Sequence, residues 1–241
     1  MDAVQQDELN KQDLVTANHI LAHQGILDAF GHVSVRSVVN PGHYFMSRSS
    51  APAMVAPDDV MEFDLDGNPL DGRGRKVYAE RCIHGEIFKA RADVNAVVHS
   101  HSPMVIPFSV TQTALQPVCH MASFLRKPVP VFEIRDVEGD NNSLLIVKGP
   151  TGAALAKTLG DSSVVLMRGH GNAVVAGNLR MAVFRAVYTE LNARIQSDAL
   201  RLGKVNYLTL QEAVNFQAAF EGSDANLLRP WEMWVRELEK A

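Results

Sequence analysis

The chain has 241 residues, of which 46% are hydrophobic and 21% are charged, and its formal net charge at pH 7 is −4. This apolar content is ordinary for a globular protein and too high for a disordered chain of such small net charge. The acidic balance excludes a surface built to bind DNA or RNA, and no run approaches the ~20 apolar residues that a membrane span needs.

Other global features favour a cytoplasmic protein made of one domain. The chain has two cysteines, Cys82 and Cys119, which are too few for a disulfide framework and lack the spacing of a zinc knuckle. The first residues, Met1 to Leu14, are polar and do not resemble a secretion signal. Because no repeat, low-complexity tract or linker divides the chain, residues 1–241 are predicted to form a single domain.

The first third of the chain is predicted to form a helix followed by strands. Apolar residues recur at helical spacing from Leu14 to Leu21, and Gly25 lies where a C-terminal cap is often needed. Alternation of apolar and polar residues then predicts strands, the first of which, H-V-S-V-R, is expected to be half-buried. The last strand ends at Asp66-Gly67, a pair typical of hairpin turns. These strands cover residues 32–36, 44–47 and 61–65.

The remainder of the chain interleaves helices with strands. A helical pattern from Tyr78 to Ala92 leads directly into an apolar, β-branched strand over residues 96–101. Two later strands flank the glycine-containing turn Arg168-Gly-His-Gly-Asn172. This order of elements indicates an α/β fold. The other predicted elements are strands at residues 163–167 and 173–176, a helix at residues 179–202, and a helix that begins at Thr209 with a capping box.

Two histidines at the end of a predicted strand give the first chemical signal. His99 and His101 are two residues apart, and because strand side chains alternate between faces, both imidazoles project to the same side. Neutral imidazole is a common zinc ligand, and catalytic zinc sites use three protein ligands. His170 is the best third ligand, since its flanking glycines let the backbone approach a metal. H-x-H alone is a weak signal, and two structural strand-end histidines are the alternative.

Glu80 adds a carboxylate to this set. It is expected on the helix just before the histidine strand, where packing of the helix against the strand can bring it to the same site. A carboxylate beside a divalent cation either ligates it or transfers protons, so Glu80 is a candidate ligand and a candidate acid/base. His84, one helical turn further along, is expected to serve hydrogen bonding or packing and not ligation.

Three segments of the chain, in this order, resemble the class II aldolase/adducin family: Ala79-Glu80, residues 95–101 (N-A-V-V-H-S-H) and Arg168-Gly-His-Gly171. The resemblance covers most of the chain. It implies a single three-layer α/β/α domain with a mixed, largely antiparallel central sheet, assembled as a homotetramer with active sites near subunit interfaces. It also implies that one divalent metal ion is bound, Zn²⁺ or Mn²⁺, with Fe²⁺ and Co²⁺ as alternatives. The implied ligands are His99, His101 and His170, and the implied acid/base is Glu80.

The segments around the predicted site bear on the substrate. Aldolases of this family act on sugar phosphates, and they bind the phosphate with a Ser/Thr-Gly-Asn motif and a Ser-Ser pair before the glutamate. The corresponding segments here read Phe30-Gly-His-Val-Ser34 and Val77-Tyr-Ala-Glu80. Residues 30–36, 44–49 and 99–109 are instead similar to members that decarboxylate hydroxylated aromatic or pyridine dicarboxylates, or ring-cleavage products. The resemblance therefore predicts a lyase that decarboxylates a small carboxylate substrate.

A shared mechanism keeps a second reaction open. Loss of CO₂ leaves electrons that a cation beside the scissile carbon can stabilise as an enolate or phenolate. Retro-aldol cleavage needs the same stabilisation. An aldolase or epimerase acting on a small sugar or hydroxy-aldehyde is therefore the first alternative, and a non-catalytic, adducin-like interaction module is the second.

Three further residues are candidates for substrate binding. His32 is expected to donate to a substrate oxygen, and the alternative is a strand-end histidine satisfied by the backbone. Arg48 is expected to pair with a substrate carboxylate, and the alternative is an ordinary surface arginine. Tyr207 is expected to reach the site of a neighbouring subunit, or otherwise to pack locally.

Overall fold

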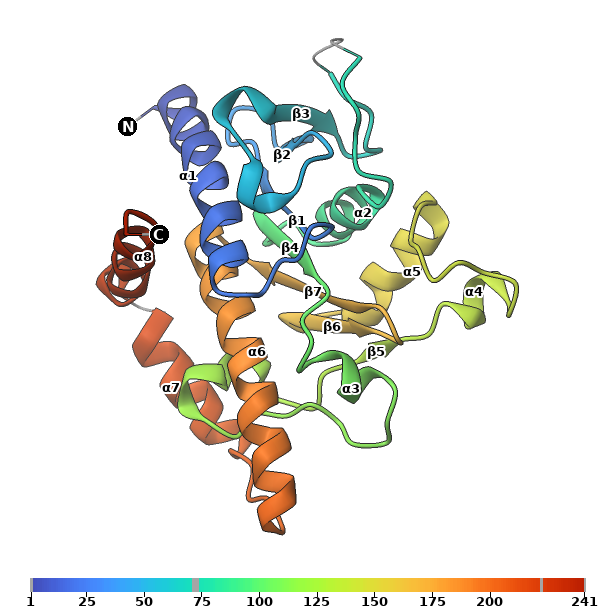
Figure 1. The fold of residues 1–241 in the computed structure, drawn as a ribbon, viewed down its shortest axis with the longest axis vertical. Helices are drawn as coiled ribbons and strands as arrows, with labels where there is room; N and C mark the ends of the chain where they lie inside the picture. The colour runs from blue at the N-terminus through green and yellow to red at the C-terminus, as the bar shows by residue number, and fades with distance from the viewer. Residues whose placement is uncertain (1, 71–73, 222, 241) are drawn as a thin grey trace.

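The structure is a computed structural model that describes residues 2–70, 74–221 and 223–240, and a seven-stranded sheet lies at its centre (Figure 1). The strands are ordered β3-β2-β1-β4-β7-β6-β5, and each neighbouring pair is antiparallel except β5 and β6, which are parallel. The predicted mixed, largely antiparallel sheet is thus confirmed. The strands are β1 (His32–Arg36), β2 (His43–Ser47), β3 (Val60–Asp64), β4 (Ala96–Ser100), β5 (Val131–Phe132), β6 (Val164–Met167) and β7 (Gly171–Ala176).

Helices cover both faces of the sheet and give the three-layer α/β/α architecture (Figure 1). One face packs against α1 (Ala3–His23), α6 (Leu179–Leu202) and α8 (Asp224–Leu238), and the other against α2 (Cys82–Ala90) and α5 (Gly149–Leu159). Short elements lie in the connections: η1 (Pro52–Met54), η2 (Pro57–Asp59), α3 (Ile106–Ser109), η3 (His120–Leu125) and α4 (Arg135–Glu138). Helix α7 (Leu210–Glu221) lies between α6 and α8 in the chain.

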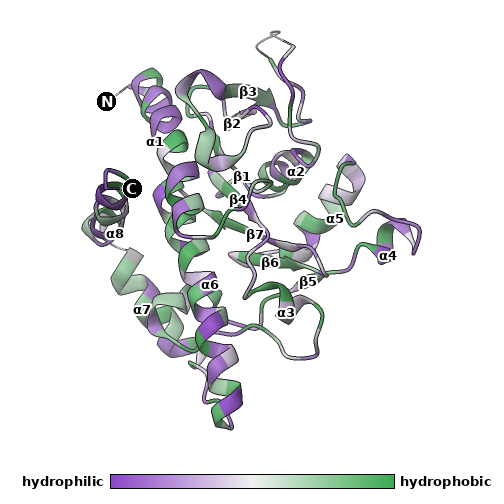
Figure 2. Cartoon of the chain, in the orientation of Figure 1, coloured by the Kyte–Doolittle hydropathy of each residue, from purple (hydrophilic) through white to green (hydrophobic). Residues whose placement is uncertain are grey.

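The hydrophobic core is divided by the sheet into two clusters. In β4, Val98 belongs to the cluster under α1 and α6, whereas Val97 belongs to the cluster under α2 and α5, because successive strand residues face opposite sides. Both side chains are fully buried. Figure 2 accordingly shows the central strands mostly in the colours of hydrophobic residues.

Strand β1 differs from the half-buried strand that its alternation predicts. All five of its residues are buried, because α2 covers the face that carries the polar side chains. His32 and Ser34 both hydrogen-bond to His84 of α2, and Arg36 donates to the backbone oxygens of Phe88 and Val94. The alternating pattern therefore marks a polar face that is buried and satisfied by hydrogen bonds, not one that is solvated.

Several predicted boundaries shift by a few residues, and two of the shifts affect the candidate site. Helix α2 begins at Cys82, so Glu80 lies in the turn before the helix and not on it. Strand β4 ends at Ser100, so His101 follows the strand.

The turn at Asp66-Gly67 is present, with Gly67 at φ +80°, although the chain returns only through an isolated bridge and not through a full strand. The capping box at Thr209 is confirmed.

None of the helices within the described residues is long and apolar enough to cross a membrane.

Candidate metal centre

Strand pairing brings three distant segments to one end of the sheet. The register of β1 with β4 places His32 opposite His99, and the register of β4 with β7 places Ser100 opposite Asn172. His170, in the turn just before β7, therefore lies beside the end of β4. The first position of β7, Gly171, needs glycine, because a Cβ there would lie 2.1 Å from the backbone oxygen of Ser100 in β4.

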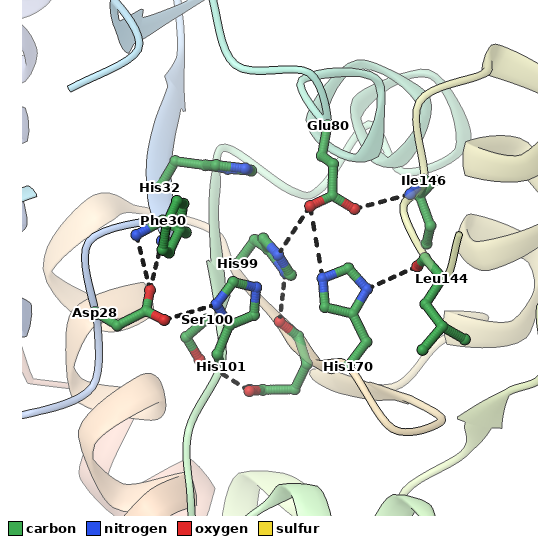
Figure 3. A network of polar contacts seen from close by, with 12 residues as sticks. Asp28, Phe30, His32, Glu80, His99, Ser100, His101, Leu144, Ile146 and His170 are labelled. Carbon is green, nitrogen blue, oxygen red and sulfur yellow. Dashed lines mark hydrogen bonds and ion pairs between the residues drawn. The ribbon is translucent and has the colours of Figure 1, made fainter. Parts of the chain in front are cut away.

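Four of the residues singled out in the sequence converge at this place (Figure 3). Glu80, His99, His101 and His170 each offer one ligand atom, and these atoms lie within 4.8 Å of one another. The ring centroids of the three histidines are 5.0–5.1 Å apart in every pair. His99 is fully buried and Glu80 is 8% exposed, so the group lies largely inside the protein.

Each histidine of the group is oriented by a hydrogen bond through its Nδ1 atom. His99 Nδ1 lies 3.1 Å from the backbone oxygen of Asn172, and His170 Nδ1 lies 2.9 Å from that of Leu144. His101 Nδ1 lies 2.9 Å from Asp28 Oδ2. Because these oxygens only accept, the network assigns the proton to Nδ1 in all three rings and leaves each Nε2 with a free lone pair. Such outer hydrogen bonds are typical of metal-binding histidines.

Two of these Nε2 atoms are buried without a partner. Within the described residues, His99 Nε2 and His170 Nε2 have no hydrogen bond. Their separations from Glu80 Oε2, 3.8 and 3.5 Å, are too long to satisfy them. Leaving a buried polar atom unsatisfied costs about 1–3 kcal/mol, so the arrangement is explained best if a ligand satisfies them. Imidazole nitrogens and a carboxylate suit a divalent transition metal, and the residues present therefore fit one.

The charge on Glu80 is maintained by its neighbours. Its Oε1 accepts the backbone N–H of Ile146 at 2.8 Å, which turns Oε2 towards the histidines (Figure 3). Burial raises the pKa of Glu80, but the contacts with His170, His99 and the Ile146 N–H together outweigh burial and hold the pKa below the ordinary value of 4.5. Conversely, burial lowers the pKa of His170, but Glu80 and the hydrogen bond to the Leu144 oxygen together raise it above 6.5. The carboxylate is thus ionised at neutral pH.

His32 packs against one side of the four-residue group. Its ring centroid lies 4.9 Å from that of His99 and 4.6 Å from that of Tyr78, and the residue is only 2% exposed. Burial lowers the pKa of His32 well below 6.5, and the neighbouring His84, His101 and His170 lower it further because they disfavour an additional positive charge. His32 is therefore neutral beside the candidate metal ligands.

The other two candidates for substrate binding have different surroundings. The guanidinium of Arg48 pairs with Asp59, with 2.5 Å between Nε and Oδ1, and the Arg48 side chain is 42% exposed. The hydroxyl of Tyr207 accepts a hydrogen bond from Gln196 of α6 at 3.3 Å. Neither residue is part of the four-residue group, and their roles in substrate binding stay predictions.

Sequence reasoning missed residues that support the group. Asp28 orients His101, and the loop before α5 supplies both the Leu144 oxygen that holds His170 and the Ile146 N–H that holds Glu80. Leu144 has a φ of +64°, which is uncommon for a residue other than glycine. No pattern in the sequence marks these contacts, because two of them are made by backbone atoms.

Comparison with known proteins identifies the family of the chain. The model of the "Class II Aldolase and Adducin N-terminal domain" matches residues 12–197. "Decarboxylase tropJ" of Talaromyces stipitatus is 36% identical over 93% of this chain and 92% of its own length. "3,4-dihydroxyphthalate decarboxylase" of Arthrobacter keyseri is 28% identical over 80% of this chain and 79% of its own.

A solved structure shows the same fold. L-fuculose 1-phosphate aldolase from Glaciozyma antarctica matches with a TM-score of 0.79 at 22% identity, covering 99% of this chain and 92% of that one. The relatives are thus named as decarboxylases and the structural neighbour as an aldolase, which are all lyases. From the family match and the relative at 36% identity, we conclude that the chain belongs to the class II aldolase and adducin family.

Proposed function

We propose that the chain is a divalent-metal-dependent lyase that decarboxylates a small hydroxylated aromatic, pyridine or ring-cleavage carboxylic acid. The observation that carries the proposal is the pair of buried, unpartnered Nε2 atoms of His99 and His170 beside the Glu80 carboxylate. The similarity to proteins named as decarboxylases supports the choice of reaction.

In this proposal, His99, His101 and His170 hold the metal through Nε2, and Glu80 is a further ligand or its acidic neighbour. The bound cation, Zn²⁺ or Mn²⁺ with Fe²⁺ or Co²⁺ as alternatives, supplies positive charge that stabilises the electrons left on the substrate when CO₂ departs. The protein contributes a rigid site, because hydrogen bonds from outside the group fix all four side chains.

Glu80 is suited to carry the proton through the reaction. Its ionised Oε2 takes the proton of the substrate hydroxyl, and after the carbon–carboxylate bond breaks it returns the proton to the carbon that has lost CO₂. The substrate hydroxyl is left as an oxyanion, which takes a proton from solvent as the product is released, so the net change replaces the carboxylate with hydrogen and regenerates Glu80. His32, 4.9 Å from the His99 ring, donates a hydrogen bond to a substrate oxygen.

We extend the proposal to the remaining predicted contacts. Arg48 binds a substrate carboxylate, which requires that its ion pair with Asp59 open or be shared. Tyr207 acts at the site of a neighbouring subunit in a homotetramer whose sites lie near the interfaces. Both contacts are secondary to the metal group.

The fold that the chain shares with a fuculose-phosphate aldolase makes aldol cleavage the second candidate. An aldolase or epimerase acting on a small sugar or hydroxy-aldehyde would use the same charge stabilisation and the same acid/base. Residues 30–32, Phe-Gly-His, favour decarboxylation, because His32 is packed against His99 where the family's aldolases carry a phosphate-binding motif.

A substrate screen separates these functions. The purified protein, loaded with Mn²⁺ or Zn²⁺, is offered hydroxylated aromatic, pyridine and muconate-type carboxylates and, in parallel, sugar phosphates, and both CO₂ and aldehyde are measured. The proposal expects CO₂ from a carboxylate, and it expects chelation to abolish the release. Aldehyde from a sugar phosphate without CO₂ from any acid contradicts it, and inactivity with no metal uptake favours an adducin-like interaction module.

A further inference from the structure

A buried chain of hydrogen bonds connects α2 with the edge of the metal centre. His84 is fully buried, and its Nε2 lies 2.6 Å from His32 Nδ1 while its Nδ1 lies 2.6 Å from Ser34 Oγ. Ser34 is also fully buried. His32 is the end of the chain that reaches the site, since its ring packs against His99.

The short contact between the two histidines limits their protonation. At 2.6 Å, one nitrogen donates and the other must be bare, so the two rings cannot both be imidazolium. Both rings are buried away from water, which disfavours the charged imidazolium, and burial lowers the pKa of His84 to about 3. With both rings neutral, each carries one proton, and the chain has two arrangements of its protons.

The arrangements differ in which atom His32 presents to the site. In the first, the Ser34 hydroxyl donates to His84 Nδ1 and His84 Nε2–H donates to His32 Nδ1, so that His32 carries its proton on Nε2. In the second, His32 Nδ1–H donates to His84 Nε2 and His84 Nδ1–H donates to Ser34 Oγ, so that His32 Nε2 carries no proton. His32 Nε2 is therefore a hydrogen-bond donor in the first arrangement and an acceptor in the second.

The Ser34 hydroxyl decides between them. In the first arrangement its proton lies in the bond to His84. In the second, that proton needs another acceptor inside the protein, and within the described part of the chain the only hydrogen bond of Ser34 Oγ is the one with His84. Leaving a buried hydroxyl without an acceptor is unfavourable, so the first arrangement is the dominant one.

We propose that Ser34 and His84 are positioning residues that hold His32 in its Nε2–H tautomer, so that His32 offers the substrate a neutral hydrogen-bond donor. The ligand class that this donor recognises is an oxygen that gains negative charge, such as the phenolate or enolate oxygen of a substrate losing CO₂. The role towards the substrate rests on the proposed function, whereas the tautomer follows from the three buried residues alone.

The test combines nitrogen-15 NMR with kinetics on the Zn²⁺-loaded protein. Histidine nitrogen shifts distinguish a protonated Nε2 from a bare one, and the His32 signals are those missing from a His32→Gln spectrum. Wild type is expected to show His32 Nε2–H. Ser34→Ala removes the directing hydroxyl, so the tautomers are expected to mix and kcat to fall by about tenfold or more, with bound zinc unchanged. Ser34→Thr, which keeps the hydroxyl, is expected to restore the tautomer.

A bare Nε2 on His32 in the wild type overturns the inference, as does a Ser34→Ala protein with an unchanged His32 tautomer. The wild-type spectrum is decisive even where Ser34→Ala does not fold. A protein that shows the Nε2–H tautomer but releases no CO₂ from any acid supports the inference about His32 and refutes the proposed function, so the two failures are distinguishable.

Discussion

His170 and Glu80 face each other inside the protein with 3.5 Å between Nε2 and Oε2, and one loop holds both of them. The Leu144 oxygen accepts from His170 Nδ1, while the Ile146 N–H donates to Glu80 Oε1. The loop therefore fixes the separation of a histidine and a carboxylate that do not satisfy each other. Leu144, whose oxygen contacts the ring, has a φ of +64°.

Replacing Glu80 with glutamine is expected to remove most of the activity. Glu80→Gln keeps an oxygen for the Ile146 N–H but loses the charge and the ability to carry a proton, so kcat is expected to fall by about 10²–10⁴-fold. The measurement is kcat for CO₂ release. A variant with more than a third of wild-type activity would show that Glu80 is not the acid/base.

The pH dependence of kcat provides a second check on Glu80. Because the pKa of this carboxyl lies below 4.5, the residue is ionised across the neutral range, and kcat is not expected to change with Glu80 protonation until the pH falls below that value. A loss of activity around pH 6 that disappears in Glu80→Gln would mean that the pKa of Glu80 is raised in the working enzyme.

Asp28 is expected to affect metal binding without contacting the metal. Asp28→Asn keeps an oxygen for the backbone N–H groups of Phe30 and Gly31, but it weakens the hydrogen bond to His101. Outer-shell substitutions of this kind cost about 10–100-fold in metal affinity or activity. Competition with a coloured chelator measures the affinity. An unchanged affinity would show that Asp28 does not orient a ligand.

Gly171→Ala is expected to unfold or strongly destabilise the site. The added Cβ would lie 2.1 Å from Ser100 O, so β7 must move away from β4, at a cost of about 3 kcal/mol or more. Gly177→Ala is the matched control at the other end of β7, since the nearest atom to its Cβ is 3.7 Å away and a change within about 0.5 kcal/mol is expected. Denaturant unfolding compares them, and equal losses would contradict the close strand approach.

Glu133 is expected to make stability depend on acid pH. Hydrogen bonds from Arg135 and Arg168 lower the pKa of Glu133 to about 2 against the opposing effect of burial. A depressed folded-state pKa stabilises the protein above the ordinary value of 4.5, and the stabilisation is lost as pH falls from 4.5 towards 2.

Glu133→Gln tests this dependence. The variant is expected to be less stable than wild type at pH 7 by about 1 kcal/mol or less, because the ion pairs lie near the surface. The difference in unfolding free energy, measured on metal-free protein, is expected to shrink as pH falls through that window. A difference that grows on acidification would reverse the assignment.

Much of the candidate site could be predicted from local patterns in the sequence. The spacing of His99 and His101 at a strand end and the glycines around His170 each have a direct structural consequence, and the fold brings all three together with Glu80. The β-branched run before His99 identified the central strand, and the long helix α6 was predicted at its observed bounds. These features succeed because the signal lies within a few residues of the chain.

Features that depend on distant contacts could not be predicted in this way. Ser34 and His84 form their hydrogen bond only when α2 packs on β1. The alternation in H-V-S-V-R therefore predicted a solvent-exposed polar face, although that face is buried. Helix α5 begins with Gly149 and Pro150, residues that usually mark loops, and α8 contains Pro230, so neither was predicted. Strand β5 has two residues, which is too short for any periodic pattern.

The most direct test of the central claim is a metal titration of the purified, metal-free protein by calorimetry, with wild type compared to His99→Ala, His101→Ala and His170→Ala. His23→Ala, at an exposed position at the end of α1, is the control. We expect one Zn²⁺ or Mn²⁺ per chain for wild type and His23→Ala, and at least about a 100-fold loss of affinity in each of the other three variants. Wild-type affinity in any of those three variants would contradict a metal centre built from these histidines.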